Sequence, residues 1–146
     1  MSASNFFTAD EQQLIVDSIK KAEKNTSGEI RVHIENRCTG DVMDRAAQVF
    51  SKLKMHETKL RNGVLLYLAT KDRRFAIIGD VGINQKVDDN FWDSTKEEML
   101  ENFKKDKFFD GLCKGILSSG EQLKSYFPYQ TDDINELSDE ISFGKN

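Results

Sequence analysis

The sequence is poor in the residues that break or cross-link a chain. It has one proline, Pro128, among 146 residues, which argues against proline-rich linkers and a disordered body. Its two cysteines, Cys38 and Cys113, stand far apart and outside any CxxC spacing, so we expect free thiols and no zinc site. A chain of this length with 38% hydrophobic residues is expected to form one domain.

Long apolar segments are also missing. The longest continuous apolar run covers residues 64–69, which is far too short to cross a bilayer. The first 20 residues contain no basic start followed by an apolar stretch, so they do not have the form of a signal peptide. These two features predict a cytoplasmic, soluble protein without a membrane span.

The body of the chain carries no excess of charge. The formal net charge is −4, and residues 129–146 account for it, with five acidic residues against Lys145. A neutral body without a basic stripe argues against nucleic-acid binding. We therefore expect a monomer with a domain at residues 1–128 and an acidic, flexible tail at residues 129–146. The tail is a candidate segment for a protein partner, which the sequence does not identify.

Four helices are expected from capping residues and apolar spacing. Thr8 and Glu11 form a capping box before a helix that reaches about Lys24. Asp41 is placed to cap a second helix, and Asp88 or Asp89 a third. The last helix is expected after Asp106 and contains three glycines, Gly111, Gly115 and Gly120. Each glycine costs about 1 kcal/mol relative to alanine, so close packing is expected to compensate.

Three strands are expected between these helices. Residues 29–35 alternate polar and apolar, residues 64–69 form a continuous apolar run, and residues 75–78 follow a short turn. The first two strands are joined by a helix and should be parallel, whereas the second and third should form an antiparallel hairpin. Residues 79–84 are expected to be a loop. The predicted fold class is α/β, a three-layer α/β/α sandwich around a small mixed sheet.

This topology brings polar side chains to one end of the sheet. Glu29 begins the first strand, Asn62 precedes the second and Asp80 follows the third. Asn84, Asp88 and Asp89 follow within a few residues. Carboxylate and amide oxygens are the ligands that Ca²⁺ and Mg²⁺ take in proteins, so this end is a candidate site for a divalent cation. The alternative is that Glu29 and Asp80 only solvate loop ends and that Asp88 caps a helix.

The opposite end of the sheet offers a weaker group of polar residues, namely Glu35, Asp72 and the pair Arg73 and Arg74. His33 lies on the polar side of the first strand. We interpret it as a surface or helix-covered histidine rather than a catalytic base, because no local pattern places a nucleophile beside it.

Several strings of the sequence resemble one known family. RNGVLLYLA at residues 61–69, DRRFAIIGDVGI at 72–83, GEIRV at 28–32 and FFDGL at 108–112 are similar to the TPM domain. The resemblance spans roughly residues 8–127 and implies an α/β/α sandwich. Family members include a thylakoid-lumen protein with acid phosphatase activity, and divalent-cation binding is associated with some members. The resemblance marks Glu29 and Asp80 as candidate ligands, whereas many members carry glutamate where this chain has Asn84.

Three hypotheses of function follow. The first is a binding or accessory module that holds Ca²⁺ or Mg²⁺ weakly at Glu29, Asp80, Asn84, Asp88 and Asp89. The second is a metal-assisted phosphatase acting on phosphomonoesters, with a metal-bound water as nucleophile. Its only cationic group for the phosphate at this end is Arg61. The third is an interaction protein without a ligand that uses the acidic tail.

Overall fold

The fold was analysed in a computed structural model that describes residues 2–130 and 135–145. Its elements follow one another along the chain as two helix–strand units, a hairpin strand, three further helices and a short last strand. They are η1 (Ala3–Asn5), α1 (Ala9–Glu23), β1 (Glu29–Glu35), α2 (Val42–Lys52), β2 (Gly63–Ala69), β3 (Arg74–Gly79), α3 (Val81–Asn84), α4 (Asp93–Phe103), α5 (Phe108–Leu123) and β4 (Ser142–Phe143).

The described strands form one mixed sheet in the order β3-β2-β1-β4. β1 and β2 are parallel, with Glu29 opposite Gly63, and β2 and β3 are antiparallel, with Val64 opposite Gly79. The parallel pair and the antiparallel hairpin predicted from the sequence are therefore confirmed. β2 is the central strand, and every one of its residues is buried, as its continuous apolar run predicts.

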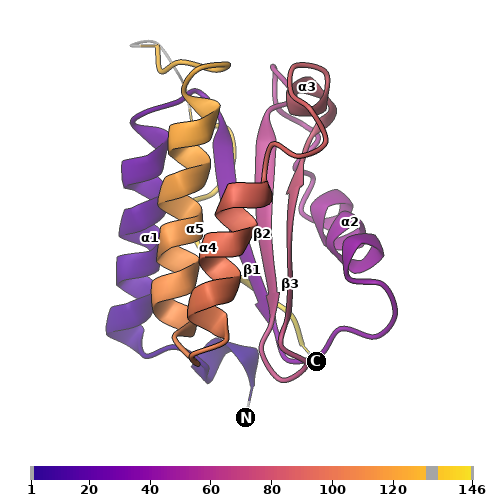
Figure 1. The fold of residues 1–146 in the computed structure, drawn as a ribbon, viewed down its shortest axis with the longest axis vertical. Helices are drawn as coiled ribbons and strands as arrows, with labels where there is room; N and C mark the ends of the chain where they lie inside the picture. The colour runs from indigo at the N-terminus through magenta and orange to yellow at the C-terminus, as the bar shows by residue number, and fades with distance from the viewer. Residues whose placement is uncertain (1, 131–134, 146) are drawn as a thin grey trace.

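The sheet is covered on both faces, as Figure 1 shows. Helices α1, α4 and α5 pack on one face, where the apolar side chains of β1 meet the larger core cluster. Helix α2 packs on the other face against β2 and β3. The α/β sandwich predicted from the sequence is confirmed. In the part of the chain that the structure describes, every helix is too short or too polar to span a bilayer.

The C-terminal segment adds a strand that the sequence did not predict. Within residues 129–146, expected to be a flexible tail, Ser142 and Phe143 form β4, which pairs in parallel with β1 with His33 opposite Ser142. Residues 131–134 and 146 of that segment lie outside the described part of the chain. The amide of Gly144 continues this pairing by donating to Ile34 O (2.9 Å). Two residues are too short a strand to show a periodic pattern, so this element has no signal in the sequence.

The predicted helix starts are confirmed at α1 and α2 and wrong at α4. Thr8 and Glu11 form the expected capping box, and Asp41 caps α2 through the amides of two residues. Helix α4 begins only at Asp93 and has no side-chain cap, so neither Asp88 nor Asp89 caps it. Residues 79–84 are not a loop, because Asp80 caps the short helix α3.

The glycines of α5 allow the close helix packing that the sequence predicts. A Cβ atom at Gly115 would lie 2.4 Å from Met99 Sδ in α4, and one at Gly120 would lie 2.9 Å from Ala22 O in α1. Gly111 is similarly close to the ring of Phe103. The three glycines therefore let α5 lie between α1 and α4 at short distance (Figure 1).

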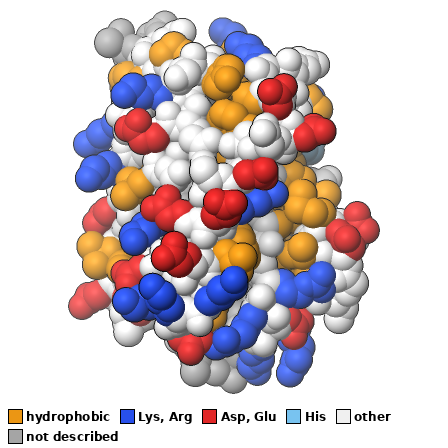
Figure 2. Space-filling view, in the orientation of Figure 1, with side chains coloured by type: hydrophobic (Ala, Val, Ile, Leu, Met, Phe, Trp, Pro, Cys, Tyr) orange, Lys and Arg blue, Asp and Glu red, His pale blue; other side chains and the backbone are white. Residues whose placement is uncertain are grey.

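Among the described residues seen in Figure 2, which include α1, α4 and α5, charges of one sign form no large region. Figure 2 shows Lys and Arg side chains interspersed with Asp and Glu over this face. This mixed pattern agrees with the neutral body that the sequence indicates.

Candidate functional site

Several residues of the predicted cation site lie at the same end of the sheet. The strand register places the start of β1, the start of β2 and the end of β3 at the same end. Glu29, Asn62 and Asp80 therefore share this end, as the topology predicts, and each is at most 5% exposed. Their hydrogen bonds decide whether they can act together as ligands.

The carboxylate of Asp80 is already paired with the guanidinium group of Arg61. Its Oδ2 and Oδ1 accept hydrogen bonds from Arg61 Nε (2.8 Å) and Nη2 (3.0 Å), and Oδ1 also accepts from Val81 N (2.7 Å). Asn84 donates its amide to Gly79 O (3.1 Å), and Asp88 and Asp89 are exposed. Among residues 2–130 and 135–145, no three His, Cys, Asp or Glu side chains are arranged to hold a metal.

Glu29 points toward the C-terminal segment instead of Asp80. Its Oε1 accepts a hydrogen bond from Leu137 N (2.7 Å). Burial raises the pKa of Glu29 to about 7, although the amides of Leu137 and Glu136 oppose this shift, and the negative charges of Glu136 and Asp139 add to it. Glu29 is thus a carboxyl group that is held near its neutral form by its surroundings.

Two further carboxyl groups lie beside Glu29. Glu23, at the end of α1, accepts a hydrogen bond from Ile30 N (2.9 Å). Burial, together with a hydrogen bond to Asp139, raises the pKa of Glu23 to about 10. Oδ1 of Asp139 is buried, and apart from the Glu23 carboxyl it has no hydrogen-bond partner among the described residues. Glu23, Glu29 and Asp139 line one pocket of about 210 Å³, which we call the acidic pocket.

The sequence could not indicate the acidic pocket as a unit. Glu23 is one of many charged residues in α1, and Asp139 lies in a segment expected to be flexible. Only Glu29 belongs to both the predicted ligand set and this pocket. The one available signal was the C-terminal excess of acidic residues, which does not reveal where the segment folds back.

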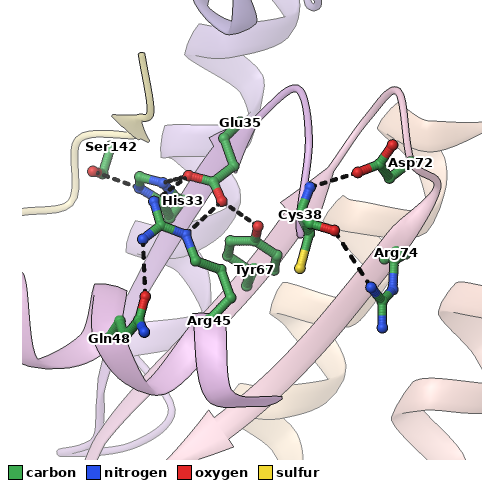
Figure 3. A network of polar contacts seen from close by, with 9 residues as sticks. All are labelled: His33, Glu35, Cys38, Arg45, Gln48, Tyr67, Asp72, Arg74 and Ser142. Atoms are coloured by element: carbon green, nitrogen blue, oxygen red, sulfur yellow. Dashed lines mark hydrogen bonds and ion pairs between the residues drawn. The ribbon is translucent and has the colours of Figure 1, made fainter. Parts of the chain in front are cut away.

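A second polar cluster lies at the other end of β1 and is drawn in Figure 3. The buried Glu35 carboxylate accepts from Arg45 Nε and Nη2, both at 2.8 Å, and from the hydroxyl of Tyr67. His33 Nε2 lies 3.0 Å from Glu35 Oε1, and His33 Nδ1 lies 2.9 Å from Ser142 Oγ. His33 is 6% exposed, so it is covered by the surrounding chain rather than placed on the surface.

Burial and hydrogen bonding fix the charges in this cluster. Burial alone would raise the pKa of Glu35, but hydrogen bonds from Arg45, Tyr67 and His33 outweigh it and lower the pKa to about 2. Burial lowers the pKa of His33, with partial opposition from Glu35, and burial raises the pKa of Tyr67. At neutral pH the cluster therefore contains an anionic Glu35, a neutral His33 and a cationic Arg45.

The other residues of the weaker predicted group lie apart from Glu35. Asp72 accepts from Cys38 N (2.6 Å), and Arg74 donates to the carbonyl of Cys38 (3.4 Å; Figure 3). Arg73 pairs with Asp106 on the surface. Sequence reasoning placed Glu35 at this end correctly, but it missed Arg45 and Ser142, the partners that make the cluster.

Comparisons with known proteins identify the family. The TPM domain matches residues 1–122. The NMR structure of the BA42 protein from the psychrophilic bacterium Bizionia argentinensis is 53% identical, with 96% of this chain and 97% of that chain covered and a TM-score of 0.91. A search of curated proteins finds no match.

Two more distant solved structures share the fold alone. The N-terminal domain of a P. gingivalis protein is 16% identical over 87% of this chain and 83% of that one, with a TM-score of 0.70. The N-terminal domain of a Corynebacterium glutamicum protein is 14% identical over 98% and 83%, with a TM-score of 0.56. From the family match over residues 1–122, we conclude that this chain belongs to the TPM domain family.

Proposed function

We propose that the protein is a binding or accessory module that takes up a divalent cation, Ca²⁺ or Mg²⁺, weakly at the acidic pocket. The observation that carries this proposal is the gathering of three carboxyl groups, those of Glu23, Glu29 and Asp139, around one pocket. Glu29 is the predicted ligand that remains, and Glu23 and Asp139 lie beside it. Because no three such side chains of the described residues are arranged to hold a metal, a cation has to draw these carboxyl groups closer together.

The electrostatics of the acidic pocket support a cation. Burial and neighbouring negative charge raise the pKa of both Glu23 and Glu29, although Lys20 and Lys24 also line the pocket. A dication would neutralise the carboxylates through hard oxygen ligands, as Ca²⁺ and Mg²⁺ prefer. Because the raised pKa of Glu23 keeps its carboxyl group protonated at neutral pH, a cation has to displace that proton. That competition is the physical reason to expect weak binding.

The pair of Asp80 and Arg61 has a different role in this proposal. Because both oxygens of Asp80 are bonded to Arg61, Asp80 supports the start of α3 and the end of β3. Asn84, Asp88 and Asp89 provide an alternative cation position only if that ion pair opens. The same ion pair occupies the arginine that a metal-assisted phosphatase would use for its substrate, so we rank the phosphatase second.

An amide-resolved NMR titration tests the proposal. The metal-free protein is titrated with Ca²⁺ and then Mg²⁺, alongside Glu29→Gln and the control Asp88→Asn. Saturable shifts at residues 23, 29 and 135–139 that disappear in Glu29→Gln and persist in Asp88→Asn are the expected result. Shifts confined to residues 79–84 and 88–89 would move the site to the predicted loop cluster. No saturable shift anywhere would refute cation binding.

A hydrolysis assay separates the two functions. The protein is incubated with 4-nitrophenyl phosphate with and without Ca²⁺ or Mg²⁺. A binding module gives no turnover above the rate of the metal alone. Metal-dependent turnover that is lost in Asp80→Asn would replace our proposal with the phosphatase.

A further inference from the structure

The cluster at the far end of β1 contains an ordered relay of three groups. Ser142 Oγ, His33 and Glu35 are joined by hydrogen bonds of 2.9 and 3.0 Å through the two ring nitrogens of the histidine (Figure 3). Within such distances a base activates a hydroxyl nucleophile while a third group orients the base. We propose that the protein hydrolyses small anionic carboxylic esters. In this proposal Ser142 is the nucleophile, His33 is the base that activates it, and Glu35 orients His33.

The charges of the cluster determine where the protons lie. Glu35 is ionised and only accepts hydrogen bonds, so His33 Nε2 carries the proton of the neutral ring. His33 Nδ1 is then bare and accepts the hydroxyl proton of Ser142. This is the tautomer that a general base needs, although the ring nitrogens are exchanged relative to the common Ser-His-Asp arrangement, in which the serine bonds Nε2.

The surrounding structure holds the relay in place. Glu35 is fixed by Arg45 and Tyr67, and the ring of Tyr67 stacks on that of His33 with an interplanar angle of 11°. Gly144 closes the cluster, because a Cβ atom there would lie 2.5 Å from Glu35 Oε1. These contacts leave the imidazole little freedom, as a positioned base requires.

A pocket gives a substrate access to the relay. His33 and Ser142 line a cavity of about 280 Å³ whose walls include Val49, Leu53 and Phe143. This volume lies just below the range typical of drug-sized ligands, so it suits a small ester. The pocket is separate from the acidic pocket, with which it shares no lining residue.

Positive charge at the pocket indicates the class of ester. Arg45, Lys52 and Lys145 line it. Arg45 is neutralised by Glu35, whereas neither lysine has an ion-pair partner among the described residues. Two unpaired ammonium groups favour a substrate that carries a negative charge.

The reaction balances with water as the only co-reactant. Ser142 Oγ bonds to the ester carbonyl carbon while its proton moves to His33 Nδ1. The C–O bond of the ester then breaks, and the alcohol leaves with the proton from His33. Water attacks the acyl-serine with His33 as base, which releases the carboxylic acid and restores the serine.

An active-site-directed probe tests the proposal on the full chain. The wild type, Ser142→Ala, His33→Gln and the control Ser51→Ala are treated with a biotin-linked alkyl fluorophosphonate, and labelled peptides are mapped by mass spectrometry. In this reaction Ser142 Oγ bonds to phosphorus, fluoride leaves and His33 takes the proton. We expect Ser142 to be the labelled residue, with labelling about a hundredfold slower in His33→Gln and unchanged in Ser51→Ala.

The wild type alone makes the proposal falsifiable, whatever the variants do to folding. Labelling spread evenly over exposed serines such as Ser51, or absent from Ser142, would overturn it. Such labelling is expected if the hydrogen bonds of Ser142, His33 and Glu35 only hold β4 against β1.

The pH dependence distinguishes an activated serine from an exposed one. Labelling should decrease as the pH falls through the pKa of His33, which lies below 6.5 because burial lowers it. The charged groups facing this ring are Glu35, Arg45 and Arg31, with Lys52 and Lys145 across the pocket. A rate independent of pH from 4 to 8 would refute His33 as the base.

Substrate charge gives a second readout. Mono-4-nitrophenyl succinate should be hydrolysed faster than 4-nitrophenyl acetate, and Lys52→Gln should reduce this preference severalfold while Lys114→Gln, on α5, leaves it unchanged. Equal rates for both esters in the wild type would remove the anionic substrate class from the proposal.

Discussion

The buried Glu35 carboxylate should govern the stability of the protein in acid. Its pKa is lowered from 4.5 to about 2 in the folded state. The folded form therefore favours the ionised carboxylate, and this contribution is present above pH 4.5 and lost as the pH falls from 4.5 toward 2. A difference of this size corresponds to about 3 kcal/mol of unfolding free energy, at 1.36 kcal/mol for each pKa unit. Solvent does not screen this carboxylate, because Glu35 is 0% exposed.

Urea unfolding at several pH values from 2 to 6 measures this contribution. The wild type should lose about 3 kcal/mol more than Glu35→Gln over this range, because the glutamine does not titrate. Glu35→Gln should also be less stable at pH 6, since Arg45 loses its partner. The control Glu97→Gln, at an exposed position of α4, should follow the wild type. Parallel curves for the wild type and Glu35→Gln would refute the argument.

Three further substitutions test other parts of the fold by urea unfolding at pH 7. Gly120→Ala should destabilise by about 1–3 kcal/mol through overpacking against α1, and an unchanged midpoint would show that the helices separate freely. Thr8→Ala should cost about 1 kcal/mol because α1 loses its cap, whereas Ser94→Ala should cost less, and equal losses would contradict the capping role. Arg61→Gln should cost about 1–3 kcal/mol by leaving Asp80 unpaired, and combining it with Asp80→Asn should recover part of that loss if the two side chains interact.

The central fold was predictable because its elements carry strong local signals. The capping box at Thr8, the cap at Asp41 and the apolar run of β2 each act within a few residues, so sequence alone indicates them. The parallel and antiparallel pairings then follow from the lengths of the connections. The start of α4 was misplaced because two adjacent aspartates have the composition of a cap, yet the chain bends at residues 88–92 before the helix begins at Asp93.

The candidate sites were less predictable because their partners come from distant segments. The ion pair joins Arg61, two residues before β2, to Asp80, the residue after β3. It depends on a positive φ of 51° at Arg61. The pairing of Glu35 with Arg45 depends on how α2 lies over the sheet. A pattern of period two or 3.6 carries no information about such contacts.

The polar face of β1 explains why both sites exist. Alternation along residues 29–35 predicts a strand with one apolar face, and it leaves open what covers the polar face. The polar face is covered by the C-terminal segment and α2, which supply a partner at each end, Leu137 for Glu29 and Ser142 for His33.

Burying a polar side chain away from water costs free energy unless it is hydrogen-bonded. The polar side chains of β1 therefore need partners from other segments, and ionisable groups are buried at both ends of this strand. Residues 29 and 35 are separated by roughly 20 Å along an extended chain. Substitutions at one pocket should therefore leave the other intact, as Glu29→Gln should leave fluorophosphonate labelling of Ser142 unchanged. Deleting residues 135–146 should instead abolish cation-dependent shifts and labelling together, since both pockets are completed by that segment. If the deletion left the shifts at residues 23 and 29 in place, Asp139 would not be a ligand, and the cation proposal would lose the observation on which it rests.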